Sequence, residues 1–188
     1  MFFMKSAYEY IKENLRSNLK DKLVEWRKQP VISRVEKPFD ILRARNLGYK
    51  DKKGFVVARV RLRRGGRKNP VVHKGRRSKR QSPKKVLKMN YQWVAEQRAS
   101  RRYSNLEVLN SYKVGKDGKN YFFEVIMVDP QRHEIQNDKN LAWITSPENR
   151  NRPLRGLTSA AKKSRGLRHK KHEAKVRPSL RAWNRRGK

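Results

Sequence analysis

Arginine and lysine are the residues of this chain with the clearest chemical meaning, because they gather in runs without acidic neighbours. No aspartate or glutamate occurs between Asp51 and Glu96, a stretch that contains the basic runs 61–68 and 74–80. Each cation that neutralises a phosphate releases condensed counterions, and this sequence-independent effect supplies most of the affinity of proteins for nucleic acids. The stretch is therefore predicted to contact a polyanion.

A second basic segment begins at Ser146, where only Glu148 and Glu173 oppose a long series of arginines and lysines. Arginine makes planar, bidentate contacts to phosphate and stacks on bases, which suits irregularly folded RNA. Two unpaired basic segments exceed what solubility requires. Glycines in both segments would let the backbone approach an RNA surface closely; they are Gly65, Gly66, Gly75, Gly156 and Gly166.

The charge of the whole chain sets the same expectation. Its 188 residues include 51 Lys and Arg against 16 Asp and Glu, a formal charge of +35, and only 35% are hydrophobic. Such an excess repels itself in a compact state unless an anion neutralises it. We expect about two-thirds of the chain to fold and the remainder to become ordered on a partner.

Catalysis and metal binding have little support in the sequence. The lack of cysteine excludes disulfides, thiolate metal sites and a cysteine nucleophile, and no nucleotide-binding glycine loop or Gly-x-Ser-x-Gly elbow can be matched. His133–Glu134 lacks the second histidine of a zinc protease motif. His169 and His172, with Glu173 nearby, are interpreted as solvated or phosphate-contacting rather than metal-binding. We therefore expect no enzyme, no cofactor or metal, and no small-molecule substrate.

Membrane insertion is not expected either. The apolar start of the chain, Met1–Met4, is too short for a signal peptide, and no apolar run is long enough to span a bilayer. A soluble, intracellular protein is predicted. Nucleic acid and an anionic membrane surface both stay open as polyanionic partners.

Hydrophobic spacing predicts an α+β domain with a small, mainly antiparallel sheet. The N-terminal helix, with a capping box at Ser6 and Glu9, is expected to dock on the core and leave its outer face solvated. The last two strands should form a hairpin, and the second, apolar on both faces, should lie centrally. The predicted elements are helix 6–28, strand 31–36, helix 39–47, strand 55–62, helix 89–102, strands 106–114 and 121–128, and helical turns within 133–144.

The strand at 55–62 connects this core to the first basic run. Its apolar residues Val56, Ala58, Val60 and Leu62 fall on one face, because side chains alternate across a strand. Its arginines at positions 59, 61 and 63 fall on the other face and are predicted to begin an RNA-facing surface.

The sequence neighbours of each aromatic residue indicate whether it packs in the core or stacks on RNA bases. Trp26, Trp93 and Trp143 are predicted to pack in the core. Tyr103 and Trp183, which lie among arginines, are candidates for stacking on exposed bases.

The chain is expected to consist of a core domain over residues 1–145, interrupted by a basic RNA-binding arm at 64–86, and a basic C-terminal extension at 146–188. A structural RNA-binding protein is favoured. A chromatin or architectural DNA-binding protein is the alternative, because it would share the charge and the extensions. A membrane-surface protein ranks third, and a nuclease or RNA-modifying enzyme last.

Several stretches of the chain resemble a large-subunit ribosomal protein of the archaeal and eukaryotic type, number fifteen. The resemblance covers the chain in order and implies a four-stranded antiparallel sheet with helices, of the β-α-β-α-β-β type. The segment Gln131–Ile144 and the lysine-rich tail look more like the archaeal branch. The stretches that carry the resemblance are 40–49, 60–68, 109–112, 122–126 and 155–160.

The resemblance implies a structural constituent of the large ribosomal subunit, cytoplasmic, in contact with large-subunit rRNA and neighbouring ribosomal proteins. An independent homo-oligomer and a membrane partner are not expected. The predicted RNA-binding residues are Arg43, Arg45, Arg59, Arg61, Arg63, Arg64, Arg67, Lys68, Lys74, Arg76, Arg77, Lys79, Arg80, Lys84, Lys85, Arg98, Arg101, Arg102, Arg155, Lys162, Lys163, Arg165, Arg168, His169, Lys170, Lys171, His172, Arg177, Arg181, Trp183, Arg185 and Arg186.

Overall fold

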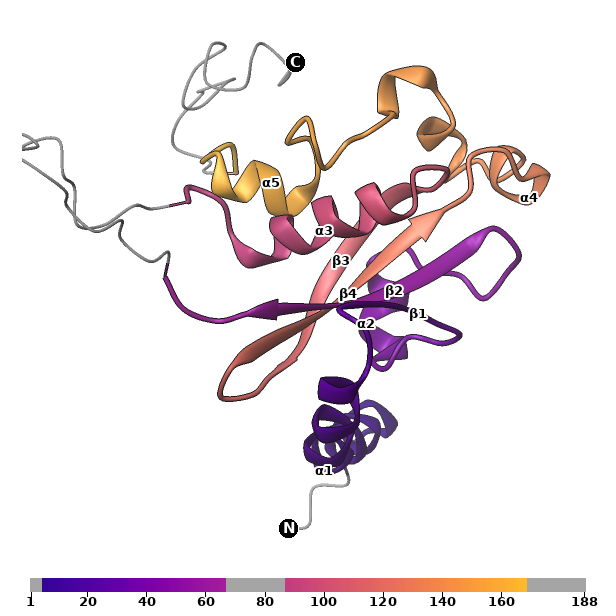
Figure 1. Cartoon of the computed structure of the whole chain (residues 1–188). Helices are drawn as coiled ribbons and strands as arrows, with labels where there is room; N and C mark the ends of the chain where they lie inside the picture. Colours follow the sequence, from indigo (N-terminus) through magenta and orange to yellow (C-terminus); the bar gives the residue numbers. More distant parts are fainter. Residues whose placement is uncertain (1–4, 67–86, 169–188) are drawn as a thin grey trace, which may run out of the picture.

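The computed structural model describes residues 5–66 and 87–168, which are built around one antiparallel sheet (Figure 1). The element order confirms the predicted α+β class. Within the described ranges the elements are α1 Ala7–Lys28, β1 Ile32–Val35, α2 Ile41–Asn46, β2 Phe55–Arg63, α3 Tyr91–Arg102, β3 Glu107–Lys116, β4 Asn120–Val128, α4 His133–Gln136, the 3-10 helices η2 Ala142–Ile144 and η3 Pro147–Asn149, and α5 Ser159–Ser164.

The sheet has the strand order β1-β2-β4-β3, and each neighbouring pair is antiparallel. β4 therefore lies inside the sheet, as its doubly apolar sequence predicted, and its residues from Phe122 to Val128 are all buried. β3 and β4 form the predicted hairpin. Its register shifts between Val108 and Asn110 and again between Lys113 and Gly115.

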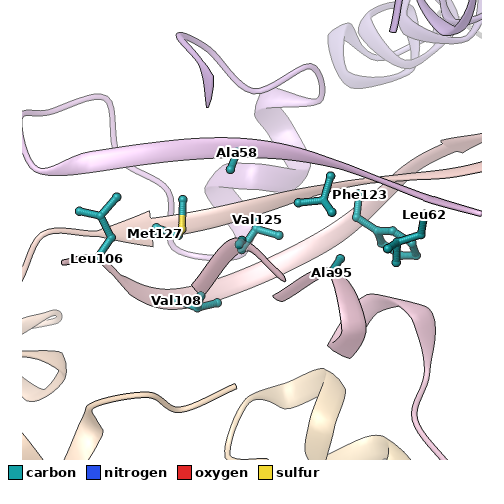
Figure 2. Close-up of a cluster of buried hydrophobic side chains, with 10 residues drawn as sticks. Ala58, Leu62, Ala95, Leu106, Val108, Phe123, Val125 and Met127 are labelled. Carbon is teal, nitrogen blue, oxygen red and sulfur yellow. The ribbon is translucent and has the colours of Figure 1, made fainter. Parts of the chain in front are cut away.

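The main apolar core lies between the sheet and α3 (Figure 2). α3 contributes Ala95 and Ala99, whose small side chains allow the helix to lie close to the strands. The face of β2 predicted to be apolar is the face that packs here. The buried members of this cluster from the strands and the turn before β3 are Ala58, Val60, Leu62, Leu106, Val108, Phe123, Val125 and Met127.

The opposite face of the sheet is covered by α1 and α2 (Figure 1). Ala44 of α2 packs in a cluster with Tyr112 and Ile126, and Trp26 of α1 packs against Phe122. The sheet is thus covered on both faces. The side chains of β2 that point away from α3 meet helices as well as solvent.

α1 docks on the sheet only through its C-terminal half. Its N-terminal capping box at Ser6 is present as predicted. Of its residues only Leu23 and Trp26 are buried, whereas Tyr10 is 59% exposed and Ile11 is 39% exposed. The prediction that this helix packs along the core is therefore correct for its second half and wrong for its first.

Arg59 lies directly opposite Glu124 in the register of β2 and β4. Its Nη2 is 3.1 Å from Oε1 of Glu124, and its guanidinium carbon is 3.8 Å from the centre of the Trp26 ring. Only 8% of the residue is exposed. The prediction that Arg59 begins the RNA-facing surface is wrong, because a carboxylate neutralises its charge inside the protein and α1 covers it.

Glu124 has two further hydrogen-bond partners. The backbone N–H of Phe39 donates to its Oε2 at 3.0 Å, and the hydroxyl of Tyr112 donates to the same oxygen. Burial and the charge of Glu124 raise the pKa of Tyr112, so the phenol keeps its proton and stays a donor. One carboxylate on β4 therefore joins β2, β3 and the segment before α2.

Replacing Arg59 by alanine is expected to lower the free energy of unfolding by about 3–5 kcal/mol, because Glu124 would stay buried without its charge partner. Arg63→Ala is the matched control on the same strand. Arg63 is exposed, so its removal should change the free energy by less than about 0.5 kcal/mol. Urea denaturation measures both variants. Equal losses in the two would contradict the structural role assigned to Arg59.

Candidate nucleic-acid interface

The predicted RNA-binding residues separate by exposure. Arg59 and Arg165 are buried, and Arg61, Arg64 and Arg155 are half-buried. The exposed residues are Arg43, Arg45, Arg63, Arg98, Arg101, Arg102, Lys162, Lys163 and Arg168. Those outside the described residues are Arg67, Lys68, Lys74, Arg76, Arg77, Lys79, Arg80, Lys84, Lys85, His169, Lys170, Lys171, His172, Arg177, Arg181, Trp183, Arg185 and Arg186.

The layer formed by α3 and the segment 149–168 has no exposed acid among its residues. Its one acid, Glu96, is fully buried. Arg98, Arg101 and Arg102 are exposed on α3, and none of them forms an ion pair with another described residue. This surface is therefore purely cationic where it carries charge.

Local sequence explains why these arginines lie where they do. Asn90 caps the N-terminus of α3, its Oδ1 accepting the backbone N–H of Trp93 at 2.7 Å. The face with Ala95 and Ala99 then turns to the sheet, which leaves position 98 and the last turn outward. Cations in the last turn are favoured by the partial negative charge of the free carbonyl groups at a helix C-terminus.

The two ends of the first basic arm lie together. The hydroxyl of Tyr91, at the start of α3, donates to the carbonyl oxygen of Gly65 at 2.5 Å, and its ring packs against Tyr121 of β4 with centroids 4.9 Å apart. Arg64 donates to the carbonyl oxygen of Asp117 at 2.6 Å. The chain therefore leaves the sheet at Gly65 and returns to the core beside the same point.

Part of the C-terminal basic segment, in α5, also lies at the N-terminal end of α3. The side-chain amide of Asn90 donates to the carbonyl oxygen of Ala160 at 2.8 Å, and its backbone N–H donates to Ser164 Oγ at 3.0 Å. α5, capped by Thr158, ends four residues before the described range ends at Arg168. The described residues thus bring both ends of the arm and the stretch 160–164 of the C-terminal segment to the N-terminus of α3.

Glu96 holds α5 against this layer. The hydroxyls of Ser111 on β3 and Thr158 on the segment before α5 donate to its two carboxylate oxygens. Burial raises the pKa of Glu96, while these hydrogen bonds and the charge of Arg152 act in the opposite direction. The carboxylate is an internal connector between α3, β3 and α5 and does not weaken the cationic surface above it.

Two more contacts fix the segment 151–168. The indole N–H of Trp93 donates to the carbonyl oxygen of Pro153 at 2.6 Å. Arg165 is 3% exposed and donates to the carbonyl oxygen of Gly156 at 2.8 Å, so the prediction that it contacts RNA is wrong for this structure. Gly156 has a φ of +73°, and a Cβ there would lie 3.1 Å from Arg165 Cδ. The role of Gly156 is therefore internal packing, because it leaves room for the side chain of Arg165.

Sequence reasoning missed the three buried carboxylates that organise this protein, Glu96, Glu107 and Glu124. Glu107 accepts the backbone N–H of Asn151 at 3.1 Å on each oxygen and so ties β3 to the C-terminal segment. A signal was present, because Glu124 interrupts a strand that is otherwise apolar on both faces. Acids in such positions need partners, which only the tertiary structure supplies.

The tryptophan predictions hold for Trp26 and Trp93, which are buried, and fail for Trp143, which is 43% exposed. The guanidinium of Arg152 lies 4.7 Å from the centre of the Trp143 ring. Tyr103 is half-buried and packs beside the main core. Trp183 lies outside the described residues, so its predicted contact with a partner stays a prediction.

Metal binding and membrane insertion have no support among the described residues. Residues 5–66 and 87–168 contain no group of three or more His, Asp or Glu side chains placed to hold a metal ion. The same ranges contain no helix long and apolar enough to cross a membrane. His169 and His172 lie outside them.

Glu96→Gln is expected to flatten the dependence of stability on pH. Because the folded pKa of Glu96 is raised, its contribution to stability is full below the unfolded pKa of about 4.3 and is lost as pH rises through the folded pKa. Glutamine cannot ionise and keeps an oxygen acceptor. Urea denaturation at a series of pH values above about 4 should show a smaller fall in the variant.

The control for this prediction is Glu36→Gln, at an exposed position on the segment after β1. It should leave the pH dependence as in the original protein. A variant at position 96 that still loses stability with rising pH as steeply as the original protein would refute the assignment.

A comparison with known protein families gives one match over nearly the whole chain. Residues 2–183 match the model of a family described as Ribosomal L15. The matched range includes all five stretches on which the resemblance was based.

Proposed function

Because this chain belongs to the L15e family, the structural proteins of the cytoplasmic large ribosomal subunit, we propose that it binds and stabilises folded large-subunit rRNA through arginine-rich surfaces and segments. Family membership confirms the predicted family, and the archaeal branch stays a prediction. A ribosomal protein family is structural, which argues against an enzymatic role. What we propose beyond family membership is that the chain contacts rRNA and that the residues named below make these contacts.

The observation that carries the proposal is the absence of exposed acid from the α3–α5 layer. A protein surface that only needs to be soluble mixes charges of both signs. Here Glu96 is withdrawn into the interior, while Arg98, Arg101 and Lys162 are left outside without exposed acidic neighbours on their own elements. Such a one-sign surface suits a sugar–phosphate backbone.

The position of the α3–α5 layer also supports binding to rRNA. The ends of the arm at 65 and 87–91 and the last described residues of the C-terminal segment lie at one end of α3. A cationic helix surface, with both ends of the arm and the stretch 160–164 of the C-terminal segment beside it, can neutralise phosphates over one continuous region of rRNA. The proposed RNA-binding set therefore omits Arg59 and Arg165, which are occupied inside the protein.

Removing the three exposed arginines of α3, Arg98, Arg101 and Arg102, by alanine substitution should weaken binding to folded rRNA and reduce its salt dependence. Each lost phosphate contact lowers the slope of log K against log salt by about 0.7–0.9, so a fall of about two units is expected. Filter binding over a series of salt concentrations measures the slope. The matched control removes three exposed lysines from other elements, Lys20, Lys28 and Lys139.

An unchanged slope in the arginine variant, or an equal fall in the lysine control, would contradict the assignment of this surface. Competition with duplex DNA separates the proposal from an architectural DNA-binding role. Folded rRNA should displace labelled rRNA at lower concentration than duplex DNA does. Equal competition by the two would favour the DNA-binding alternative.

The arm should hold the protein on the subunit. Alanine at Arg67, Arg76 and Arg77 is expected to release the chain from large subunits at a lower salt concentration, because three fewer counterion-releasing contacts remain. Sucrose-gradient fractionation at increasing salt, with detection of the chain, measures the midpoint of release. A midpoint equal to that of the original protein would refute a role for these arginines.

A further inference from the structure

A groove lies on the face of the protein opposite α3, where α1, the segment before α2 and β3 meet. Its volume is about 260 Å³. That is slightly below the range of about 300–1,000 Å³ found for sites that enclose drug-sized ligands. A double helix is far too large for this space, and a single planar group fits its scale.

The apolar part of the lining, called the floor here, is the smaller part of the groove surface. It is formed by four half-buried side chains, Leu15, Leu19, Phe39 and Val114. Phe39 is fixed from below, because its ring meets Trp26 edge-on with centroids 5.2 Å apart.

The walls stand close because of a glycine in β3. At Gly115, next to Val114, a Cβ would lie 3.2 Å from Leu19 Cδ1 and 3.3 Å from Leu23 Cδ2. The register of β3 also shifts between Lys113 and this glycine. The absent side chain and the irregular strand together let α1 approach the sheet and form one side of the groove.

The rim is cationic. Lys12 and Arg16 of α1 and Arg43 of α2 line it, and all three are exposed. Lys113 of β3 also borders the groove, but its Nζ lies 4.6 Å from the centre of the Tyr121 ring, which packs in the cluster under α3. None of them forms an ion pair within residues 5–66 and 87–168. The one acid of the lining, Asp40, has its carboxylate at the N-terminus of α2, where Oδ1 accepts the backbone N–H of Arg43 at 2.9 Å.

We propose that this groove receives one unpaired nucleotide of rRNA, with the base on the apolar floor and its flanking phosphates at the cationic rim. A nucleotide joins a planar, largely apolar base to anionic phosphates a few ångströms away, which matches apolar side chains beside the cations of α1 and α2. An acidic peptide would match the rim and leave the floor without an apolar partner. The inference rests on the proposed rRNA binding and adds a second, separate contact.

The groove makes the protein two-sided. α3 and α5 lie on one side of the sheet, and α1 and α2 lie on the other (Figure 1). The chain would therefore hold an unpaired nucleotide on one face while the exposed arginines and lysines of α3 and α5 neutralise phosphates on the opposite face. It would join two rRNA segments through a rigid sheet rather than coat one of them.

Ultraviolet crosslinking of purified large subunits, followed by mass spectrometry, tests the groove in the complete assembly. Nucleotide adducts are expected on peptides that contain Phe39 or Val114. Adducts elsewhere in the chain with none on these peptides would overturn the groove and leave the proposed function intact. Chemical crosslinks from Lys12 to another protein, without nucleotide adducts there, would show a protein occupant and overturn it as well. No adduct anywhere would speak against rRNA binding itself.

A matched pair of variants gives the second test. Lys12→Ala with Arg16→Ala removes two cations of the rim from α1. The control, Lys20→Ala with Lys28→Ala, removes two exposed lysines of the same helix that do not line the groove. The rim variant should lower the salt slope for rRNA binding by about one to two units and the control by much less. Equal slopes in the two would overturn the proposal.

Discussion

The carboxylate of Glu124 is the interaction on which the arrangement of this protein depends. It lies on the central strand and meets Arg59 across the sheet, Tyr112 from β3 and the backbone of Phe39. Because the guanidinium of Arg59 also stacks on Trp26, the pair fixes α1 as well as two strands. A buried charge pair of this kind adds little net stability compared with apolar packing, but it tolerates no missing partner. It therefore specifies one register and one helix position.

The same principle shapes the outer surface. The chain has a formal charge of +35 and few acids. When one of these acids is buried, the exposed cations near it have no acidic side chain beside them on the surface. Glu96 and Glu107 connect α3, β3 and the C-terminal segment from within, so the layer that they hold together presents cations alone. The scarcity of acids and their burial thus serve two purposes, since they organise the core and leave a surface suited to phosphate. On the one strand β2, Arg59 is paired inside the protein and Arg63 stays exposed.

Local pattern was sufficient for much of the fold. Period-two alternation identified β2 and the hairpin, and the doubly apolar strand was correctly expected at the centre of the sheet. The capping box at Ser6 and Glu9 marked the start of α1. Local sequence could not predict which side chains pair across the sheet. Nothing local distinguishes Arg59 from Arg63, which lie on the same face of one strand, yet α1 covers the first and leaves the second in solvent. The groove under α1 was missed for the same reason, because it depends on how three distant segments meet.

A density map of the large subunit at side-chain resolution, obtained by electron cryomicroscopy with this chain in place, tests the central claim most directly. The account predicts rRNA phosphates beside the exposed arginines of α3, with Arg59 still paired to Glu124 and Glu96 still bound to Ser111 and Thr158. Phosphate contacts made by Arg59, or the buried carboxylates turned outward to solvent or RNA, would contradict it.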